Sequence, residues 1–165
     1  MESKFPLRSI LDGIQPKLEA VSTAQAHEPI AVGKWSKIQI LGHLIDSGIN
    51  NLNRFIRAQL TEDMIFEPYA QEFWVKAQAY EKQDWDDVVA LFLALNNQIS
   101  VLIQNISEDK LTKTRTDHSM SPPFYFDKAA DSPVTLEVLI WDYIGHLEHH
   151  IRQVFPDYHP VVLNH

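Results

Sequence analysis

Apolar residues recur every three or four positions in four stretches of this chain, a spacing that places them along one face of an α-helix. The first stretch predicts a helix near residues 10–21, although Gly13 and Pro16 lie inside it, so we expect a kink or a late start. The second stretch begins at an N-cap signal, Trp35-Ser36, and should end near residues 61–63. The apolar series of these two stretches are Leu7, Leu11, Ile14, Leu18 and Val21, and then Ile38, Leu41, Ile45, Ile49, Leu52 and Ile56.

A third helix should follow a connection that contains Pro68 and Tyr69. Within that connection, a short stretch around Trp74 could itself be helical. Asp84 or Asp86 is the expected N-cap of the third helix, because a carboxylate there accepts otherwise unpaired backbone N–H groups. Its core face is expected to consist of Val88, Leu91, Leu95, Ile99 and Leu102.

The fourth helix is expected to start at Pro133, a position where proline is well tolerated, and to stop before Pro156. Residues 107–132 show no sustained period and include the consecutive prolines Pro122 and Pro123, which predicts a long loop. The apolar series of the fourth helix is Leu136, Ile140, Tyr143, Leu147, Ile151 and Val154.

These patterns predict an all-α fold, a four-helix bundle of antiparallel helices with a long loop before the last helix. No run of alternating apolar and polar residues calls for a sheet. A length of 165 residues predicts a single domain over residues 1–165. Helical bundles build metal sites from side chains on facing helices.

Composition narrows the class of protein. The apolar content is 45% and the formal net charge is −8, which indicates a folded chain and argues against a nucleic-acid partner. Because the chain has no cysteine, it has no disulfide and no cysteine nucleophile, and a metal would need nitrogen or oxygen ligands. The N-terminus lacks the apolar core of a secretory signal, and no apolar run approaches a membrane span. We therefore expect a soluble, cytoplasmic protein with no membrane partner.

The histidines are the strongest chemical signal. His146 and His150 are four residues apart, so both imidazoles project from one face of the fourth helix, as two ligands of one divalent cation would. His43, in the second helix, could supply a third ligand if the two helices pack side by side. Three protein ligands would leave coordination positions open for water or substrate. The motif is not HExxH, because Leu147 stands where a metalloprotease has its glutamate.

Spacing alone leaves two interpretations open, because an HxxxH pair is more often structural or incidental than metal-binding. His43 lies opposite the apolar stripe of its helix, on the same side as Asn50 and Arg54. That side could be a solvated face, or it could line a cleft in which Asn50 and Arg54 bind a polar or anionic substrate group. On the fourth helix, Asp142 could orient an imidazole as a hydrogen-bond acceptor, whereas His149 points further toward the polar side and is the weaker ligand candidate.

Three segments of the chain are similar to a known family. The runs WSKIQILGHLIDSGINNLNRFIRAQLTED, IFEPY and DYIGHLEHHI resemble the DinB-like superfamily, and most closely its YfiT-type branch of metal-dependent hydrolases and bacillithiol transferases. The resemblance covers most of the chain from Trp35 to Val154. It implies a four-helix bundle, commonly a homodimer, with a three-histidine site for nickel or zinc.

Carried over by motif, this resemblance makes His43, His146 and His150 the metal ligands and favours the cleft interpretation of His43. The sequence departs from the branch at two positions. Gly145 stands where the branch often has tryptophan, and Gln153 where a further histidine is common. Both departures put the substrate and the activity in doubt more than the binding of a divalent metal.

The sequence thus supports a metal-dependent enzyme, either a thiol S-transferase or a hydrolase. A divalent ion would lower the pKa of a bound water or thiol, and the thiol would be a low-molecular-weight cosubstrate because the chain has none. One alternative is a non-catalytic helical dimer that binds a metal or a small ligand as a stress-response or interaction module. A structural bundle without metal is the third hypothesis.

Overall fold

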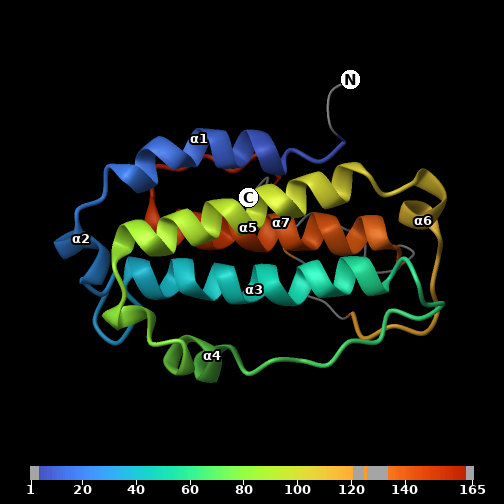
Figure 1. The fold of residues 1–165 in the computed structure, drawn as a ribbon, viewed down its shortest axis with the longest axis horizontal. Coiled ribbons are helices and arrows are strands. Elements are labelled where there is room, and N and C mark those ends of the chain that lie inside the picture. Colours follow the sequence, from blue (N-terminus) through green and yellow to red (C-terminus); the bar gives the residue numbers. More distant parts are fainter. Residues whose placement is uncertain (1–3, 121–124, 126–133, 163–165) are drawn as a thin grey trace.

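Four long helices lie side by side along the long axis of the molecule (Figure 1), in a computed structural model that describes residues 4–120, 125 and 134–162. The expected all-α four-helix bundle is confirmed. Across the described residues, extended backbone pairing is limited to isolated bridges. The long helices are α1 (Leu7–Glu19), α3 (Lys37–Arg57), α5 (Trp85–Gln104) and α7 (Leu136–Val154), and the short segments are α2 (Thr23–His27), α4 (Gln71–Ala77), η1 (Tyr80–Lys82) and α6 (Glu108–Thr112).

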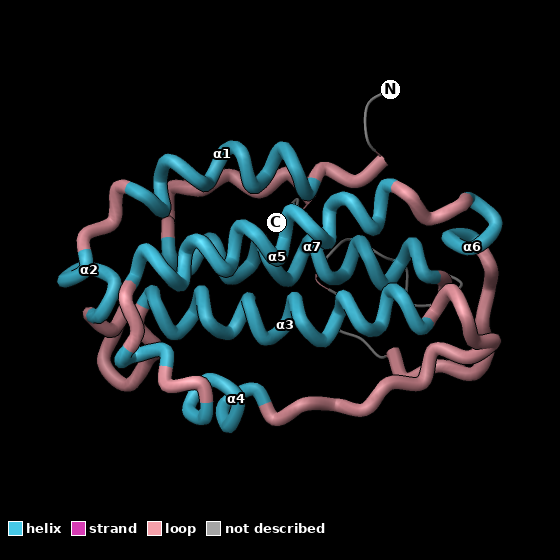
Figure 2. Tube along the Cα trace, viewed as in Figure 1, coloured by secondary structure: helices cyan, strands magenta, loops and turns pink. Residues whose placement is uncertain are grey.

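Helices α3 and α5 run in the same direction, and α1 and α7 run opposite to them (Figure 1). Antiparallel neighbours were expected, and the packed pair α3 and α5 is the exception. The reason is the connection between them, which returns along the length of the bundle and contains α4 and η1 (Figure 2). A helix of 21 residues such as α3 is about 30 Å long, and residues 58–84 are enough to span that distance.

Helix α1 begins earlier than expected and passes through its proline. It starts at Leu7, not near residue 10, and continues through Pro16 to Glu19. The early start buries Leu7 on the same face as the other apolar residues of the helix, while Val21 lies beyond its end. An interior proline removes one backbone hydrogen bond, and burial of this apolar face against the bundle outweighs that loss.

The caps of α3 and α5 follow the sequence more closely. Ser36 is the N-cap of α3, and its backbone N–H donates to Gln39 Oε1 at 3.0 Å. The helix ends at Arg57, short of the expected residues 61–63. Asp84 is the N-cap of α5, and its Oδ1 accepts the backbone N–H of Asp86 at 2.9 Å.

The connections contain more helix than the sequence suggested. The stretch around Trp74 is helical and forms α4. The long loop expected over residues 107–132 is interrupted by α6, which follows Ser107 at its N-cap and has acidic residues in its first turn, where they meet the positive end of the helix dipole. A five-residue helix is too short to show a period, so periodicity alone could not reveal it.

Helix α7 begins at Leu136 after the N-cap Thr135, whose Oγ1 accepts the backbone N–H of Val138 at 3.2 Å. The expected start at Pro133 was therefore too early, because a threonine cap further along the chain supplies the stronger signal. Pro133 itself, and Pro122 and Pro123 in the preceding segment, lie outside the described residues.

The first half of α3 is buried on every side. Residues 40–48 are all buried, because α2, α4, α5, α7 and η1 pack around this helix. The polar side that includes His43 is thus covered by other segments and is not a solvated face. The second half is more open: Ile49 and Ile56, both expected in the core, are 42% and 45% exposed.

Gly42 allows η1 to approach α3. A Cβ atom added at Gly42 would lie 2.2 Å from Cδ2 of Tyr80, so the tyrosine ring occupies the place of a side chain. The hydroxyl of Tyr80 donates to Oδ1 of the buried Asp46 at 2.8 Å, and Nε2 of Gln78 donates to the same oxygen at 2.8 Å. These contacts hold the return connection against the polar side of α3.

The core face of α5 is rotated from the expected one. Leu91 is 49% exposed, whereas Phe92 and Asn96 are fully buried. Apolar residues occur on most sides of this helix, so periodicity does not fix which side faces inward. Asn96 is accommodated because its Oδ1 accepts the hydroxyl of Tyr143 at 2.5 Å and its Nδ2 donates to the carbonyl of Phe92 at 2.9 Å.

Within the described ranges, α5 is the one helix long and apolar enough to cross a membrane by length and composition, which the sequence analysis had not anticipated. It packs against α1 and α3, and the inner helix of a bundle meets the same criteria. The packing of α5 in the bundle accounts for its apolar composition.

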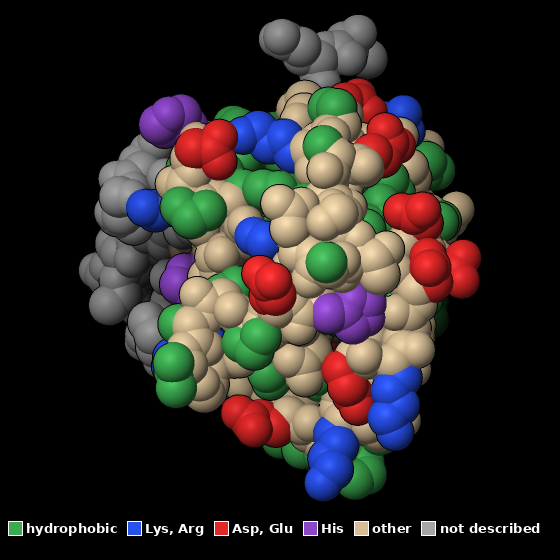
Figure 3. All heavy atoms as spheres, turned by 90° about the vertical axis from the view of Figure 1, so that its left-hand side faces the viewer, with side chains coloured by type: hydrophobic (Ala, Val, Ile, Leu, Met, Phe, Trp, Pro, Cys, Tyr) green, Lys and Arg blue, Asp and Glu red, His purple; other side chains and the backbone are tan. Residues whose placement is uncertain are grey.

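At the end of the molecule that includes α2, acidic, basic and hydrophobic side chains are interspersed over the surface (Figure 3).

We expect Gly42→Ala to lower the free energy of unfolding by about 1–3 kcal/mol, because the new methyl group overlaps the ring of Tyr80. Gly13→Ala is the matched control, since no atom lies within 4 Å of a Cβ added there, and it should stabilise α1 by roughly 0.5–1 kcal/mol. Urea unfolding followed by circular dichroism measures both. Equal effects of the two substitutions would contradict the close approach of Tyr80 to α3.

Candidate metal centre

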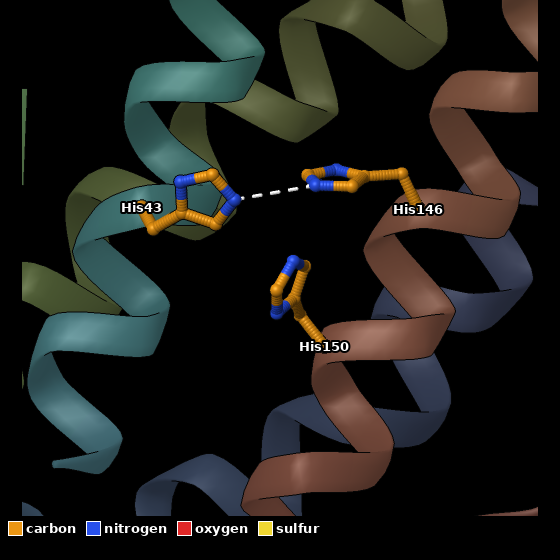
Figure 4. Close-up of side chains that lie close together, drawn as sticks. All are labelled: His43, His146 and His150. Atoms are coloured by element: carbon orange, nitrogen blue, oxygen red, sulfur yellow. Dashed lines mark hydrogen bonds between the residues drawn. The ribbon is translucent and has the colours of Figure 1, made fainter. Parts of the chain in front are cut away.

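Three histidines from two helices converge between α3 and α7 (Figure 4). His43 extends from α3, and His146 and His150 extend from successive turns of α7, with the three rings directed toward one another. One ring nitrogen of each histidine lies within 4.8 Å of those of the other two. The Nε2 atoms of His43 and His146 are 3.2 Å apart. The structure therefore brings together the three residues that the sequence singled out, here called the histidine trio.

Burial keeps the histidine trio uncharged. His43 is only 1% exposed, and burial, with a smaller effect of the charge on His150, lowers its pKa to about 4. Burial likewise lowers the pKa of His146 well below its usual value, and repulsion from the neighbouring histidines adds to this. The pKa of His150 is also lowered by burial, against the opposing effect of its hydrogen bond to Gln153. At neutral pH each ring is therefore in the form that offers a lone pair to a metal ion.

The spacing of the nitrogen atoms suits a metal ion. Two nitrogen ligands of one tetrahedral zinc ion, at bond lengths of about 2.0–2.1 Å, lie about 3.3 Å apart. The observed 3.2 Å between His43 and His146 is close to this value. Among the described residues, this trio is the one group of three or more histidine, aspartate or glutamate side chains with such geometry. Three imidazoles suit zinc, nickel, copper or iron, and they leave coordination positions open.

Polar neighbours orient two of the three rings. Oγ of Ser47 lies 3.4 Å from Nδ1 of His146, and Oε1 of Gln153 lies 3.0 Å from Nδ1 of His150. Contacts of this kind fix the tautomer of an imidazole and leave the other nitrogen, Nε2, for a metal. Nδ1 of His43 is buried and has no hydrogen-bond partner among the described residues, so the polar contact of this ring is the one between its Nε2 and Nε2 of His146.

Asp142, expected to orient an imidazole, instead holds a backbone segment. Its Oδ1 accepts the backbone N–H of Tyr125 at 2.7 Å. The Tyr125 ring lies edge-on against that of His146, with ring centroids 4.8 Å apart. Asp142 thus acts on His146 through the placement of a tyrosine. No sequence pattern in the preceding loop indicated Tyr125.

Two cavities are lined by members of the trio. The first, of about 160 Å³, is lined by His146. The second, of about 520 Å³, is lined by His150. The other residues of the first cavity are Ser47, Asn51, Arg54, Tyr69, Tyr125, Leu139, Asp142 and Tyr143, and the other residues of the second are Ile30, Ala31, Gly33, Lys34, Trp35, Ile40, Gln71, Glu72 and Gln153.

Of the two residues expected to bind substrate, one lines the His146 cavity and the other does not. Arg54 lines the His146 cavity. Asn50 lines a neighbouring cavity of about 280 Å³, and its Nδ2 donates to the backbone carbonyl of Asp46 at 2.8 Å. The amide side chain in the His146 cavity is that of Asn51, which the sequence analysis missed. Its position one turn after Ser47, which itself lies one turn after His43, could have indicated it.

The other candidate histidine lies at the edge of the centre. The ring of His149 is 5.1 Å from that of His150 between centroids, and it is not one of the converging group. Its Nε2 lies 3.3 Å from Nε2 of Gln153, the residue that also contacts His150. This placement agrees with its ranking as the weaker ligand candidate.

Residues 11–154 of the sequence match the DinB superfamily. This match includes all three members of the histidine trio and all four long helices apart from the start of α1. The chain belongs to the DinB superfamily. Its membership was expected from the motifs around His43 and His146 and is confirmed.

Two relatives of this chain have names that refer to a metal-dependent activity. "Putative metal-dependent hydrolase YfiT" of Bacillus subtilis (strain 168) is 26% identical over 157 residues, which cover 93% of this chain and 83% of that protein. A "Putative metal-dependent hydrolase" of Bacillus cereus is 25% identical over 130 residues, which cover 79% of this chain and 68% of that protein.

Two solved structures share the fold of this chain. The structure of YfiT from Bacillus subtilis, described as having "an unusual four-helix bundle topology", matches with a TM-score of 0.70 at 21% identity, over 91% of this chain and 82% of that one. A mycothiol-dependent maleylpyruvate isomerase matches with a TM-score of 0.60 at 17% identity, over 92% of this chain but only 62% of that one. At these identities the likeness shows the fold alone.

Gly145 and Gln153, the two positions at which the sequence was expected to depart from the YfiT-type branch, lie close to the trio. A Cβ atom at Gly145 would lie 2.3 Å from the backbone oxygen of Tyr125, so the glycine makes room for the tyrosine backbone. The Tyr125 ring then contacts His146, which makes it an aromatic neighbour of this histidine. Gln153 supplies the hydrogen bond to His150.

We expect Gly145→Ala to displace Tyr125 from α7, because the methyl group would overlap the tyrosine backbone. In the unaltered protein the Tyr125 amide is bonded to Asp142 and should exchange its hydrogen slowly. Hydrogen exchange resolved at single amides measures the difference, and faster exchange is expected in the variant. A Tyr125 amide equally protected in both proteins would show that this approach does not depend on glycine.

Proposed function

We propose that His43, His146 and His150 bind one divalent metal ion, zinc or nickel, and that the protein is a metal-dependent enzyme. The observation that supports this best is the convergence of three neutral imidazoles on one point with a spacing that suits a single ion. The metal-dependent hydrolases named among the relatives support it independently. The metal centre is the part of the proposal on which the reaction depends.

Such an ion, when bound, lowers the pKa of a water or a thiol and stabilises the resulting anion. The protein holds the ligand rings in place through Ser47 and Gln153, and it keeps bulk water from His43 by burial. Position 147 is a buried leucine, so the glutamate base of an HExxH enzyme is absent from this helix. With no cysteine in the chain, a thiol nucleophile comes from a small molecule.

Of the two reactions expected from the sequence, we propose thiol S-transfer over hydrolysis. Hydrolysis needs one organic substrate, whereas S-transfer needs two, and members of the trio line two cavities. The larger, at His150, would take a low-molecular-weight thiol, and the smaller, at His146, would take the electrophile. The thiol sulfur bonds to the electrophilic carbon, the leaving group departs with its electron pair, and the thiol proton passes to solvent. The mycothiol-dependent enzyme that shares this fold is consistent with a thiol cosubstrate.

Two further expectations stay predictions. The homodimer rests on the family resemblance, and the cytoplasmic location is proposed together with the thiol cosubstrate. A low-molecular-weight thiol is typical of a reducing compartment, which agrees with that location.

We expect the protein, purified without chelator, to contain one zinc or nickel ion per chain. His146→Ala should weaken metal binding by more than about 100-fold, because loss of an outer partner alone costs about 10–100-fold. His149→Ala is the matched control, since it removes the neighbouring imidazole outside the converging group. Plasma emission analysis gives the metal content, and competition with a chromophoric chelator gives the affinity.

Full metal occupancy in His146→Ala would exclude this set of ligands. Stoichiometric metal in the unaltered protein, with no turnover of any thiol and electrophile pair, would favour the non-catalytic binding module over the enzyme.

We expect Ala31→Trp to raise the KM for the thiol at least several-fold and to leave the KM for the electrophile nearly unchanged. Ala31 lines the His150 cavity, so a large side chain there would narrow it. Val32→Trp is the control, because the adjacent Val32 is fully exposed and lies outside the residues that line that cavity. Initial rates measured with each substrate varied in turn separate the two constants. An increase confined to the electrophile would reverse the assignment of the two cavities.

A further inference from the structure

Arg54 lies where three cavities meet. It lines the His146 cavity of about 160 Å³, an adjoining one of about 230 Å³, and the one of about 280 Å³ that contains Asn50. The adjoining cavity also shares Leu139 with the His146 cavity, so the two lie on either side of the same residues. The guanidinium of Arg54 is therefore next to any molecule that approaches His146 from this side.

The Arg54 guanidinium is incompletely paired. Its Nη2 donates to the backbone carbonyl of Glu67 at 3.1 Å, and its Cζ lies 5.6 Å from the centroid of the Phe66 ring. Among the described residues it forms no ion pair with a carboxylate, although Asp142 lines two of the same cavities. Burial lowers its pKa from the ordinary arginine value, although the group stays charged at every physiological pH. A guanidinium has five N–H donors, and most of those of Arg54 remain available to a ligand.

A half-buried cation without a counter-ion is unfavourable, because burial removes water that is not replaced by an opposite charge. A carboxylate compensates the charge and matches the planar fork of the guanidinium with two parallel hydrogen bonds. The remaining walls of the His146 cavity include tyrosine rings, Leu139 and the amide of Asn51, which suit the body of a small organic acid. They also include the carboxylate of Asp142, whose Oδ1 accepts the backbone N–H of Tyr125.

We propose that Arg54 binds the carboxylate of a small monocarboxylic electrophile and holds its reacting atom toward His146. This inference rests on the proposed function, because it names the substrate class of the smaller cavity. A volume of about 160 Å³ equals the share of about five water molecules, which limits the substrate to a short acid unless it extends into the adjoining cavity.

A phosphate monoester fits this position less well than a carboxylate. It has a charge of about −1.5 to −2 at pH 7, and Arg54 is the one cationic side chain among the residues that line the His146 cavity. The formal net charge of the chain, −8, also disfavours a doubly charged ligand over a singly charged one.

The test is a nuclear magnetic resonance titration of the full chain with butyrate and with its neutral analogue butyramide. It is made on metal-free protein, so that direct binding of the carboxylate to a metal ion does not contribute. We expect butyrate to shift the side-chain amide signals of Asn51 saturably, and butyramide to leave them nearly unchanged. Arg54→Gln should weaken butyrate binding about tenfold or more, and Arg54→Lys, which keeps the charge but loses the fork, should fall between.

Arg57→Gln is the matched control. Arg57 lies on the same helix, its guanidinium is 5.8 Å from the centroid of the same Phe66 ring, and it lines only the cavity of about 280 Å³. Butyrate affinity should therefore change less than about twofold in this variant. Circular dichroism of each variant shows whether the bundle is folded, and Arg54→Lys serves as the informative variant if the glutamine substitution impairs folding.

Equal affinity of the unaltered protein for butyrate and butyramide would overturn the proposal, as would unchanged butyrate binding in Arg54→Gln. Tighter binding of inorganic phosphate than of butyrate would overturn the assignment to a carboxylate. Metal content is measured separately, and Arg54→Gln should keep it. If the protein binds metal and turns over its substrates but butyrate binding does not depend on Arg54, only this inference is rejected. If butyrate binding depends on Arg54 but the protein takes up no metal, the proposed metal-dependent enzyme is rejected and the carboxylate site at Arg54 is retained.

Discussion

Three imidazoles, one buried and two half-buried, share a space between α3 and α7, and the surrounding structure keeps them neutral and in place. A charged imidazole there would lack solvent and a counter-ion, so burial favours the neutral form of all three. The cover is supplied by a connection that runs back along the bundle, with Tyr80 packed on Gly42. The parallel arrangement of α3 and α5 is thus linked to the centre, because the same connection produces both.

The residue pattern was sufficient for the long helices and for the His146 and His150 pair, because both are local patterns, whereas His43 joined them through the family resemblance. Ser36 and Asp84 were recognisable as caps, and the HxxxH spacing placed His146 and His150 on one face. The sequence pattern was insufficient for features that depend on contacts between distant segments. The helical wheel left His43 undecided between solvent and cleft, since burial of that side depends on a segment distant in sequence. The inward face of α5 was misjudged at Leu91, because an almost uniformly apolar helix has no preferred side until a partner such as Tyr143 pairs with Asn96.

Members of the trio line two cavities of different character. The walls of the His146 cavity include three tyrosines, one amide, one guanidinium and the carboxylate of Asp142, and those of the His150 cavity include Trp35 and Ile40 together with exposed polar residues. Gly145 contributes to this difference, because it makes room for the Tyr125 backbone and so allows the Tyr125 ring to contact His146. A single residue of α7 thereby shapes the cavity beside His146.

The contact between His43 and His146 joins residues that are 103 positions apart in the chain. Closing so long a loop has an entropic cost that local helix formation does not share. During synthesis, α7 leaves the ribosome after every other helix. The complete set of nitrogen donors therefore exists only in the finished chain, and a ribosome-bound fragment that ends before α7 offers an ion a single imidazole of the three.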